Sequence, residues 1–143
     1  SAATLAEVVA ARLDQIAELI QIARRNASLQ PDTLRKRLRQ MVTELLEASP
    51  ALPEDRLAME AALLIQRSDA TEELDRLEAH AQAVRDLLAD GGPIGRRLDF
   101  LCQELNREAN TLCSKSSDLE LTRLGLALKA AVEQLREQVQ NIE

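Results

Sequence analysis

The stretch IGRRLDFLCQELNREANTLC, residues 94–113, decides the fold class of this 143-residue chain. Its apolar residues recur every three or four positions, at Ile94, Leu98, Leu101, Cys102, Leu105, Ala109, Leu112 and Cys113. This spacing is typical of an amphipathic α-helix with one face in a core. The preceding Gly91-Gly92-Pro93 is a typical break between two helices. We therefore expect a helix that begins after Pro93.

Five further segments show the same periodicity and are separated by helix-breaking residues. We expect helices at about 4–27, 31–48, 53–66, 69–90 and 117–142. The predicted fold class is all-α: an antiparallel helical bundle of about six helices with long helical hairpins. Residues 1–50 should form one helical hairpin and residues 51–143 the remaining helical region, together a single unit. The last helix is apolar over a wide arc, so its own domain or another subunit should cover it on two sides.

The composition excludes several classes of protein. The net charge of −6 argues against a surface that is basic all round, so a nucleic-acid partner would need a local patch or another chain segment. Cys102 and Cys113 fit neither a disulfide framework nor a paired-cysteine metal clip, and we expect reduced core cysteines. No apolar run approaches the roughly 18 residues of a bilayer span, and the start does not read as a signal peptide. We therefore expect a cytoplasmic protein without a membrane partner.

The polar face of the 94–113 helix is unusual for a solvent-exposed surface. It carries Arg96, Asp99, Gln103, Asn106, Arg107 and Asn110, flanked by Arg97, Glu104 and Glu108. Asparagine is a mediocre helix former, so several amides among charged residues suggest a face that hydrogen-bonds something specific. The alternative is a polar seam between helices or subunits.

A second candidate site lies on the 69–90 helix, where Glu73, Arg76 and His80 share one face. Histidine can transfer protons near neutral pH, although a lone helix histidine is more often structural or solvated. Carboxylates brought together by folding could hold a divalent cation, and ordinary surface ion pairs would explain them equally well. These carboxylates are Glu60, Glu73, Asp99, Glu104 and Glu108. The sequence contains no zinc motif, phosphate-binding glycine loop or nucleophilic-serine motif.

A basic cluster near the first helix break is a candidate phosphate-contact patch. It consists of Arg24, Arg25, Arg35, Lys36, Arg37 and Arg39, with Asp32 the one acid in the window. No aromatic residue lies nearby to stack bases, so contacts there would be directed at the nucleic-acid backbone. The alternatives are a solvated charged face and a docking surface for an acidic partner.

The segment GRRLDFLCQELNREAN at 95–110, followed by TLCSKS, resembles the signature of the C-terminal region of the YicC family of endoribonucleases. The ending REQVQNIE, the segment SDATEELDRLEAH at 68–80 and residues 57–64 are similar to that family too. The resemblance covers about 57–143, whereas 4–48 matches only in helical character and order.

The resemblance implies a stress-related bacterial endoribonuclease that assembles as a homo-oligomer, a hexamer, and cuts RNA with a divalent cation, Mg²⁺ or Mn²⁺. The polar positions that it carries over are Glu60, Glu73, Arg76, His80, Arg96, Asp99, Gln103, Glu104, Arg107, Glu108, Asn110, Ser114 and Lys115. Among them we assign His80 as general acid or base, and Glu73, Glu104 and Glu108 as metal ligands.

Further roles on this interpretation belong to cations and amides. Glu73 also counts among the catalytic residues, and Arg76, Arg97 and Arg107 would neutralise phosphate charge. The RNA-binding set comprises the basic cluster together with Arg96, Gln103, Asn110 and Lys115.

The family also has a sizeable N-terminal domain that this sequence does not contain. We therefore expect a piece of a longer protein, which need not be active alone. The alternatives are a non-catalytic helical oligomerisation domain and an adaptor that binds RNA or protein without cutting.

Overall fold

The computed structural model describes residues 2–26, 30–115 and 119–140, and within them it contains helices and no strand. The helices of this described part are α1 (Ala2–Arg24), α2 (Pro31–Ala48), α3 (Glu54–Ser68), α4 (Thr71–Asp90), α5 (Gly95–Ser114) and α6 (Leu119–Gln140). The predicted all-α class is confirmed. The ends predicted for the last helix, at 117 and 142, lie outside the described residues.

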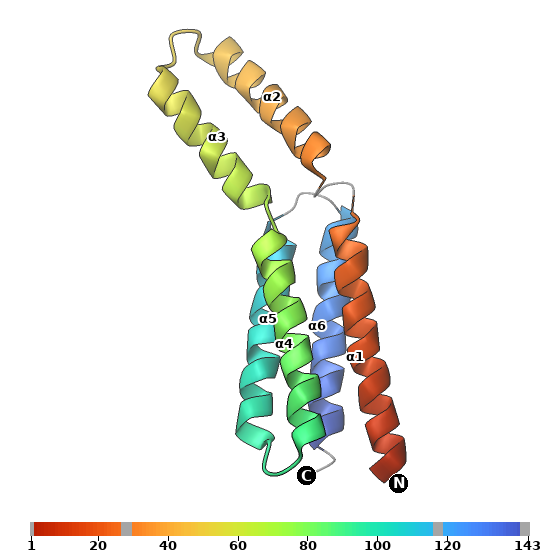
Figure 1. Ribbon diagram of the computed structural model, residues 1–143. Coiled ribbons are helices and arrows are strands. Elements are labelled where there is room, and N and C mark those ends of the chain that lie inside the picture. The colour runs from red at the N-terminus through yellow and green to blue at the C-terminus, as the bar shows by residue number, and fades with distance from the viewer. Residues whose placement is uncertain (1, 27–29, 116–118, 141–143) are drawn as a thin grey trace.

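Helices α1, α4, α5 and α6 form a four-helix bundle in which each helix runs antiparallel to its two neighbours (Figure 1). α4 and α6 lie beside both α1 and α5. The apolar stripes of these four helices meet in one core. Its fully buried large side chains include Ile16, Ile20, Leu77, Leu105, Leu112, Leu121, Leu128 and Leu135. This burial is the main stabilising contribution to the bundle.

Helices α2 and α3 contact each other and project from one end of the bundle as a hairpin (Figure 1). The hairpin expected from residues 1–50 is therefore wrong, because α1 packs on α4 and α6 whereas α2 packs on α3. Residue 50 lies in the loop between α2 and α3, so a division there would separate two helices in contact. Apolar periodicity shows which face of a helix is buried and does not identify the helix that covers it.

The turn between α4 and α5 depends on two glycines. Gly91 and Gly92 have φ angles of +73° and +77°, a left-handed conformation that glycine adopts without a steric penalty. They end α4 and reverse the chain, so α5 returns along α4. This reversal sets the antiparallel pair on which the candidate site is built.

α5 and α6 approach closely at Gly125, where an added Cβ would overlap Sγ of Cys113. Both cysteines are free thiols: Cys102 is buried, and Cys113 is half-buried. The prediction of reduced cysteines at apolar helix positions is consistent with this packing. None of the described helices combines the length and apolarity of a bilayer span.

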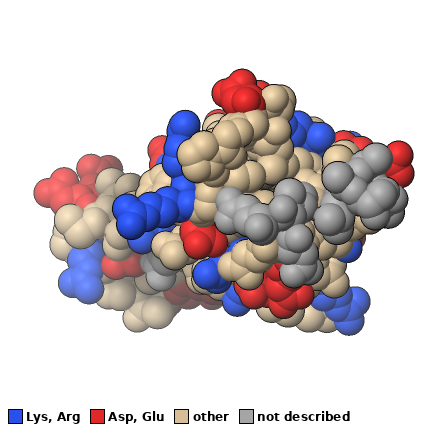
Figure 2. All heavy atoms as spheres, turned by 90° about the horizontal axis from the view of Figure 1, so that it is seen from below, with Lys and Arg blue, Asp and Glu red and all other residues tan. Residues whose placement is uncertain are grey.

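The surface charges at the lower end of the bundle are mixed. Figure 2 views that end and shows Lys and Arg interspersed with Asp and Glu rather than gathered by sign. This face therefore offers no extended cationic surface for a polyanion.

Candidate metal centre

The interface between α4 and α5 brings His80 together with Glu104 and Glu108. One ligand atom from each residue lies within 4.8 Å of the other two. Glu104 and Glu108 are four residues apart on α5, so both carboxylates lie on the same side of that helix. α4 packs against α5, and the imidazole of His80, on α4, meets this pair from the other side of their interface.

All three side chains are at least partly buried, and Glu108 already accepts a hydrogen bond from Arg76. The Glu108 side chain is 7% exposed and that of Glu104 is 22% exposed, while His80 is half-buried. Within the described residues the side chain of His80 makes no hydrogen bond or ion pair. Its ring nitrogens therefore have no protein partner that a ligand would have to displace.

The donor set fits a divalent cation. Carboxylate oxygens are preferred by Mg²⁺ and Mn²⁺, and one imidazole nitrogen is compatible with Mn²⁺ in particular. Two carboxylates this close repel each other when both are ionised, and a cation between them removes that repulsion. The set leaves further coordination positions for water or a phosphate oxygen.

Arg76 holds the Glu108 carboxylate in its orientation through a hydrogen bond. Its Nε donates a 2.8 Å hydrogen bond to Oε1 of Glu108, and its two Nη atoms lie 3.3 Å from carboxylate oxygens of Glu72 and Glu73. The hydrogen bond with Glu108 is the main cause that raises the pKa of the Arg76 guanidinium. Carboxylates that bind metals are commonly held in this way by an outer hydrogen-bond partner.

Glu73 lies outside the group of potential ligands. It is 3% exposed, and its Oε1 accepts hydrogen bonds from Nη2 of Arg76 and from Nζ of Lys115, the latter at 2.9 Å. Its Oε2 is buried and has no hydrogen-bond partner among the residues that the structure describes. Glu73 precedes His80 by seven residues, about 10 Å along a helix. Glu73 is therefore not in the group of ligands among which we predicted it, although it shares Arg76 with Glu108.

Lys115 connects this charged network to the base of the hairpin. Its Nζ lies 2.9 Å from both Oε1 of Glu73 and the backbone carbonyl oxygen of Asp69, the residue that follows α3. The Asp69 carboxylate accepts hydrogen bonds from Thr71, and these bonds, first that of the Thr71 side chain and then that of its backbone N–H, lower the pKa of the Asp69 carboxyl. Lys115, predicted to bind RNA, is thus engaged within its own chain.

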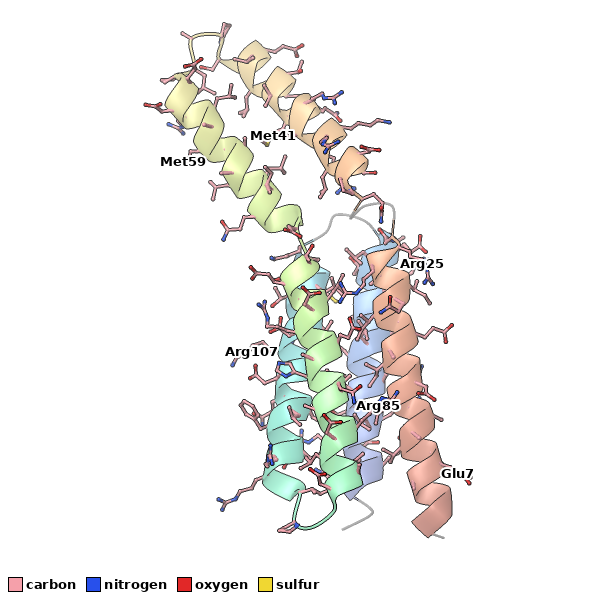
Figure 3. The ribbon with its side chains drawn as sticks, viewed as in Figure 1. Glu7, Arg25, Met41, Met59, Arg85 and Arg107 are labelled. Carbon is pink, nitrogen blue, oxygen red and sulfur yellow. The ribbon has the colours of Figure 1, made fainter. Side chains whose placement is uncertain are left out.

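Of the predicted phosphate-neutralising arginines, Arg107 lies at the edge of the centre, whereas Arg97 precedes Glu104 by seven residues, about 10 Å along α5. Arg107 is 74% exposed, with Nε 4.0 Å from Glu104, and projects from the outer side of α5 (Figure 3). Arg97 lines a hollow of about 330 Å³ together with Arg96, Phe100, Leu101 and Ala83. The amides Gln103 and Asn110 are exposed on α5.

The basic cluster divides between two parts of the fold. Arg24 pairs with Asp75 at 2.9 Å and Glu78 at 2.7 Å, both on α4. Arg25 is exposed at the end of α1 (Figure 3). The other four cations lie on α2, where Arg35 pairs with Asp32. Lys36, Arg37 and Arg39 make no ion pair with any residue that the structure describes.

Two further acids that we considered as metal ligands, Asp99 and Glu60, lie outside the group of His80, Glu104 and Glu108. Asp99 pairs with Arg136 of α6 at 3.3 Å, and Glu60 lies half-buried on α3 in the hairpin.

The sequence interpretation missed Phe100, which is 59% exposed next to two arginines. A signal was present, because Phe100 falls between Arg96 and Gln103 at helical spacing on the polar face of its helix.

Residues 22–143 match the family model described as "Endoribonuclease YicC-like, C-terminal". Two curated relatives, from Haemophilus influenzae and Clostridioides difficile, are each named "Probable endoribonuclease YicC". They are 41% and 39% identical to this chain over 139 residues, 97% of its length. The same alignment covers 47% of each relative, so the chain spans about half their length.

Proposed function

Because the chain belongs to the family of YicC-like endoribonucleases and matches its C-terminal region, we propose that it carries the metal centre of an enzyme that hydrolyses RNA. One observation supports this most directly: the ligand atoms of His80, Glu104 and Glu108 lie within 4.8 Å of one another. That spacing is compatible with a single cation between them.

The three residues would bind a divalent cation such as Mn²⁺ or Mg²⁺. Such a cation supplies Lewis-acid chemistry, because it polarises a phosphate oxygen and makes a water molecule more acidic. Glu104 and Glu108 would contribute carboxylate oxygens and His80 a ring nitrogen. The assignment of His80 changes accordingly, since a ring nitrogen that binds a cation cannot also accept a proton.

Other side chains would position the centre and the substrate. Arg76 holds the Glu108 carboxylate through its 2.8 Å hydrogen bond. Arg107, beside the centre, and Arg97, about 10 Å farther along α5, are exposed, and their charges would stabilise the charge that develops on the phosphate. Glu73 would act through Arg76 and would not contact the cation.

Assembly into a homo-oligomer, with the hexamer implied by the family resemblance, is part of the same proposal. The hairpin supports it, because α2 contains no buried residue and α3 exposes Met59 and Ile65 by 65% and 51%. Apolar side chains exposed together commonly mark an interaction surface. Light scattering of the chain tests this, and a monomer at all concentrations would exclude assembly through this chain.

The same hairpin supports a second candidate function, a non-catalytic interaction domain. Its exposed apolar residues and its cations Lys36, Arg37 and Arg39 would then bind a partner, and the metal centre would be a structural cluster. Metal binding and cleavage distinguish the two functions.

The test combines calorimetry with Mn²⁺ and cleavage of a labelled single-stranded RNA, with and without chelator. We expect Mn²⁺ to bind the chain, and His80→Ala and Glu104→Gln to abolish both binding and metal-dependent cleavage. Asp86→Asn is the matched control, because Asp86 is an exposed acid on α4 outside the group. Failure of the chain to bind a divalent cation, or unchanged cleavage in both variants, would exclude the proposed centre.

A further inference from the structure

The hollow beside the metal centre has an unusual composition. Phe100 is the chain's only aromatic residue, and 59% of it is exposed. Arg96 and Arg97 line the same hollow of about 330 Å³ and are exposed. The hollow thus combines an apolar aromatic ring with two positively charged guanidinium groups one helical turn away on α5.

The charges of the two arginines are not compensated within the chain. Neither Arg96 nor Arg97 forms an ion pair or a hydrogen bond with any described side chain. By contrast, Arg24, Arg76, Arg85 and Arg136 each pair with acidic residues. The hollow therefore favours a ligand that brings negative charge.

The hollow lies on the same interface between α4 and α5 as the metal centre. Phe100 precedes Glu104 by four residues, about 6 Å along the helix, and Ala83 follows His80 by three residues. The spacing on both helices thus places the hollow about one helical turn from the centre. A polymer held at the centre by one phosphate would present its neighbouring unit at Phe100.

We propose that Phe100, Arg96 and Arg97 form a binding site for an unpaired base of RNA, next to the phosphate held at the metal centre. The base stacks on the Phe100 ring, and the guanidinium groups contact the flanking phosphates. The identity of the ligand as RNA rests on the proposed function. The site accepts any base, because every base has a face that stacks, and it selects against duplexes, whose bases are already stacked.

A direct test uses Phe100→Trp, which introduces the only tryptophan in this chain. The variant is titrated with single-stranded oligouridylate in chelator, so hydrolysis plays no part. We expect saturable quenching of the tryptophan fluorescence by the single strand and little quenching by a duplex of equal length. The matched control is Leu126→Trp, on α6, where the native residue is 54% exposed. It should show no saturable quenching.

Binding of the same oligonucleotide by Phe100→Ala provides the second measurement. Loss of one stacked base should weaken it roughly 5- to 100-fold. Arg96→Ala with Arg97→Ala should reduce the salt dependence of binding.

Three results would overturn the inference. They are absence of quenching in Phe100→Trp, equal quenching in Leu126→Trp, and a Phe100→Trp signal that changes with protein concentration but not with RNA. The last result would mean that a second copy of the chain covers the ring. Quenching without metal-dependent cleavage would leave the stacking site intact and count against the proposed function alone. Metal-dependent cleavage together with unchanged oligonucleotide binding by Phe100→Ala would count against the stacking site alone.

Discussion

Nε of Arg76 donates a 2.8 Å hydrogen bond to Oε1 of Glu108, and this bond joins a network of ion pairs to the candidate metal centre. On one side of it, Glu73 and Lys115 continue the network to the base of the hairpin at Asp69. On the other side lie His80 and Glu104. The orientation of a proposed ligand therefore depends on residues two helical turns away.

Replacement of Arg76 by Lys should weaken Mn²⁺ binding by about 10- to 100-fold, because lysine has no Nε donor at that position to hold Glu108. Calorimetric titration measures the change in Kd. Arg85→Ala is the control, since Arg85 also lies on α4 but pairs with Asp14 of α1. In a Glu108→Gln background the Arg76 substitution should have no further effect. An unchanged Kd in the single variant would exclude the positioning role.

The ion pair between Glu73 and Lys115 should contribute to folding stability. Lys115→Met leaves the Glu73 carboxylate, which is 3% exposed, with Arg76 as its remaining cationic partner. We expect the free energy of unfolding to fall by about 2–3 kcal/mol, below the usual loss for a fully buried pair because Lys115 is 21% exposed. Urea denaturation measures this. Adding Glu73→Gln should recover part of the lost free energy of unfolding. If the effects of the two substitutions on that free energy simply add, the two side chains are not directly coupled.

The close approach of α5 and α6 predicts a steric cost at Gly125. Gly125→Ala should lower the free energy of unfolding by about 1–3 kcal/mol, because the new Cβ overlaps Sγ of Cys113. Thermal denaturation of the variant provides the measurement. Cys113→Ala removes the overlapping atom, so Gly125→Ala should cost much less in that background. An equal cost in both backgrounds would assign the loss to another cause.

The thiol of Cys102 should make stability depend on pH above 9. Burial raises its pKa from 9.0 to about 11, and the nearby carboxylates of Asp99 and Glu133 act in the same direction against Arg136. Well below pH 9 the thiol is protonated in both states and has no effect. Between pH 9 and 11 the unfolded chain loses this proton while the folded chain keeps it, so stability falls by up to about 3 kcal/mol. Cys102→Ala should lack this component, and parallel pH profiles of the two proteins would refute it.

The hairpin should be dispensable for folding of the bundle. Among the described side chains, the buried core contains none from α2 or α3. Replacement of residues 30–68 by a short flexible linker should therefore preserve helical circular dichroism and a cooperative thermal transition. RNA binding should weaken and its salt dependence should decrease, because Lys36, Arg37 and Arg39 are removed. Loss of cooperativity would show that the hairpin stabilises the bundle.

The local pattern of apolar residues and helix breaks predicted where the helices lie, and it did not predict which helices pack against each other. The break at Gly91 and Gly92 and the apolar stripe that ends at Cys113 place α5 correctly. The pairing of α1 with α2 was wrong, because α1 and its partner α6 are far apart in the sequence. A hydrophobic stripe is complementary to any other stripe of similar width, and packing of the complete set of helices selects among them.

By itself, the sequence determined that the chain is all-helical, which face of each helix is apolar, and that polar residues line α4 and α5 at helical spacing. These properties follow from interactions between residues three and four positions apart, which the order of amino acids specifies directly. Only the tertiary structure decided that His80 meets Glu104 and Glu108, that Arg24 and Lys115 are engaged by acceptors within the chain, and that Phe100 is exposed beside two arginines. Such relationships depend on the rotation and offset of one helix against another, and these are set by packing of the whole core.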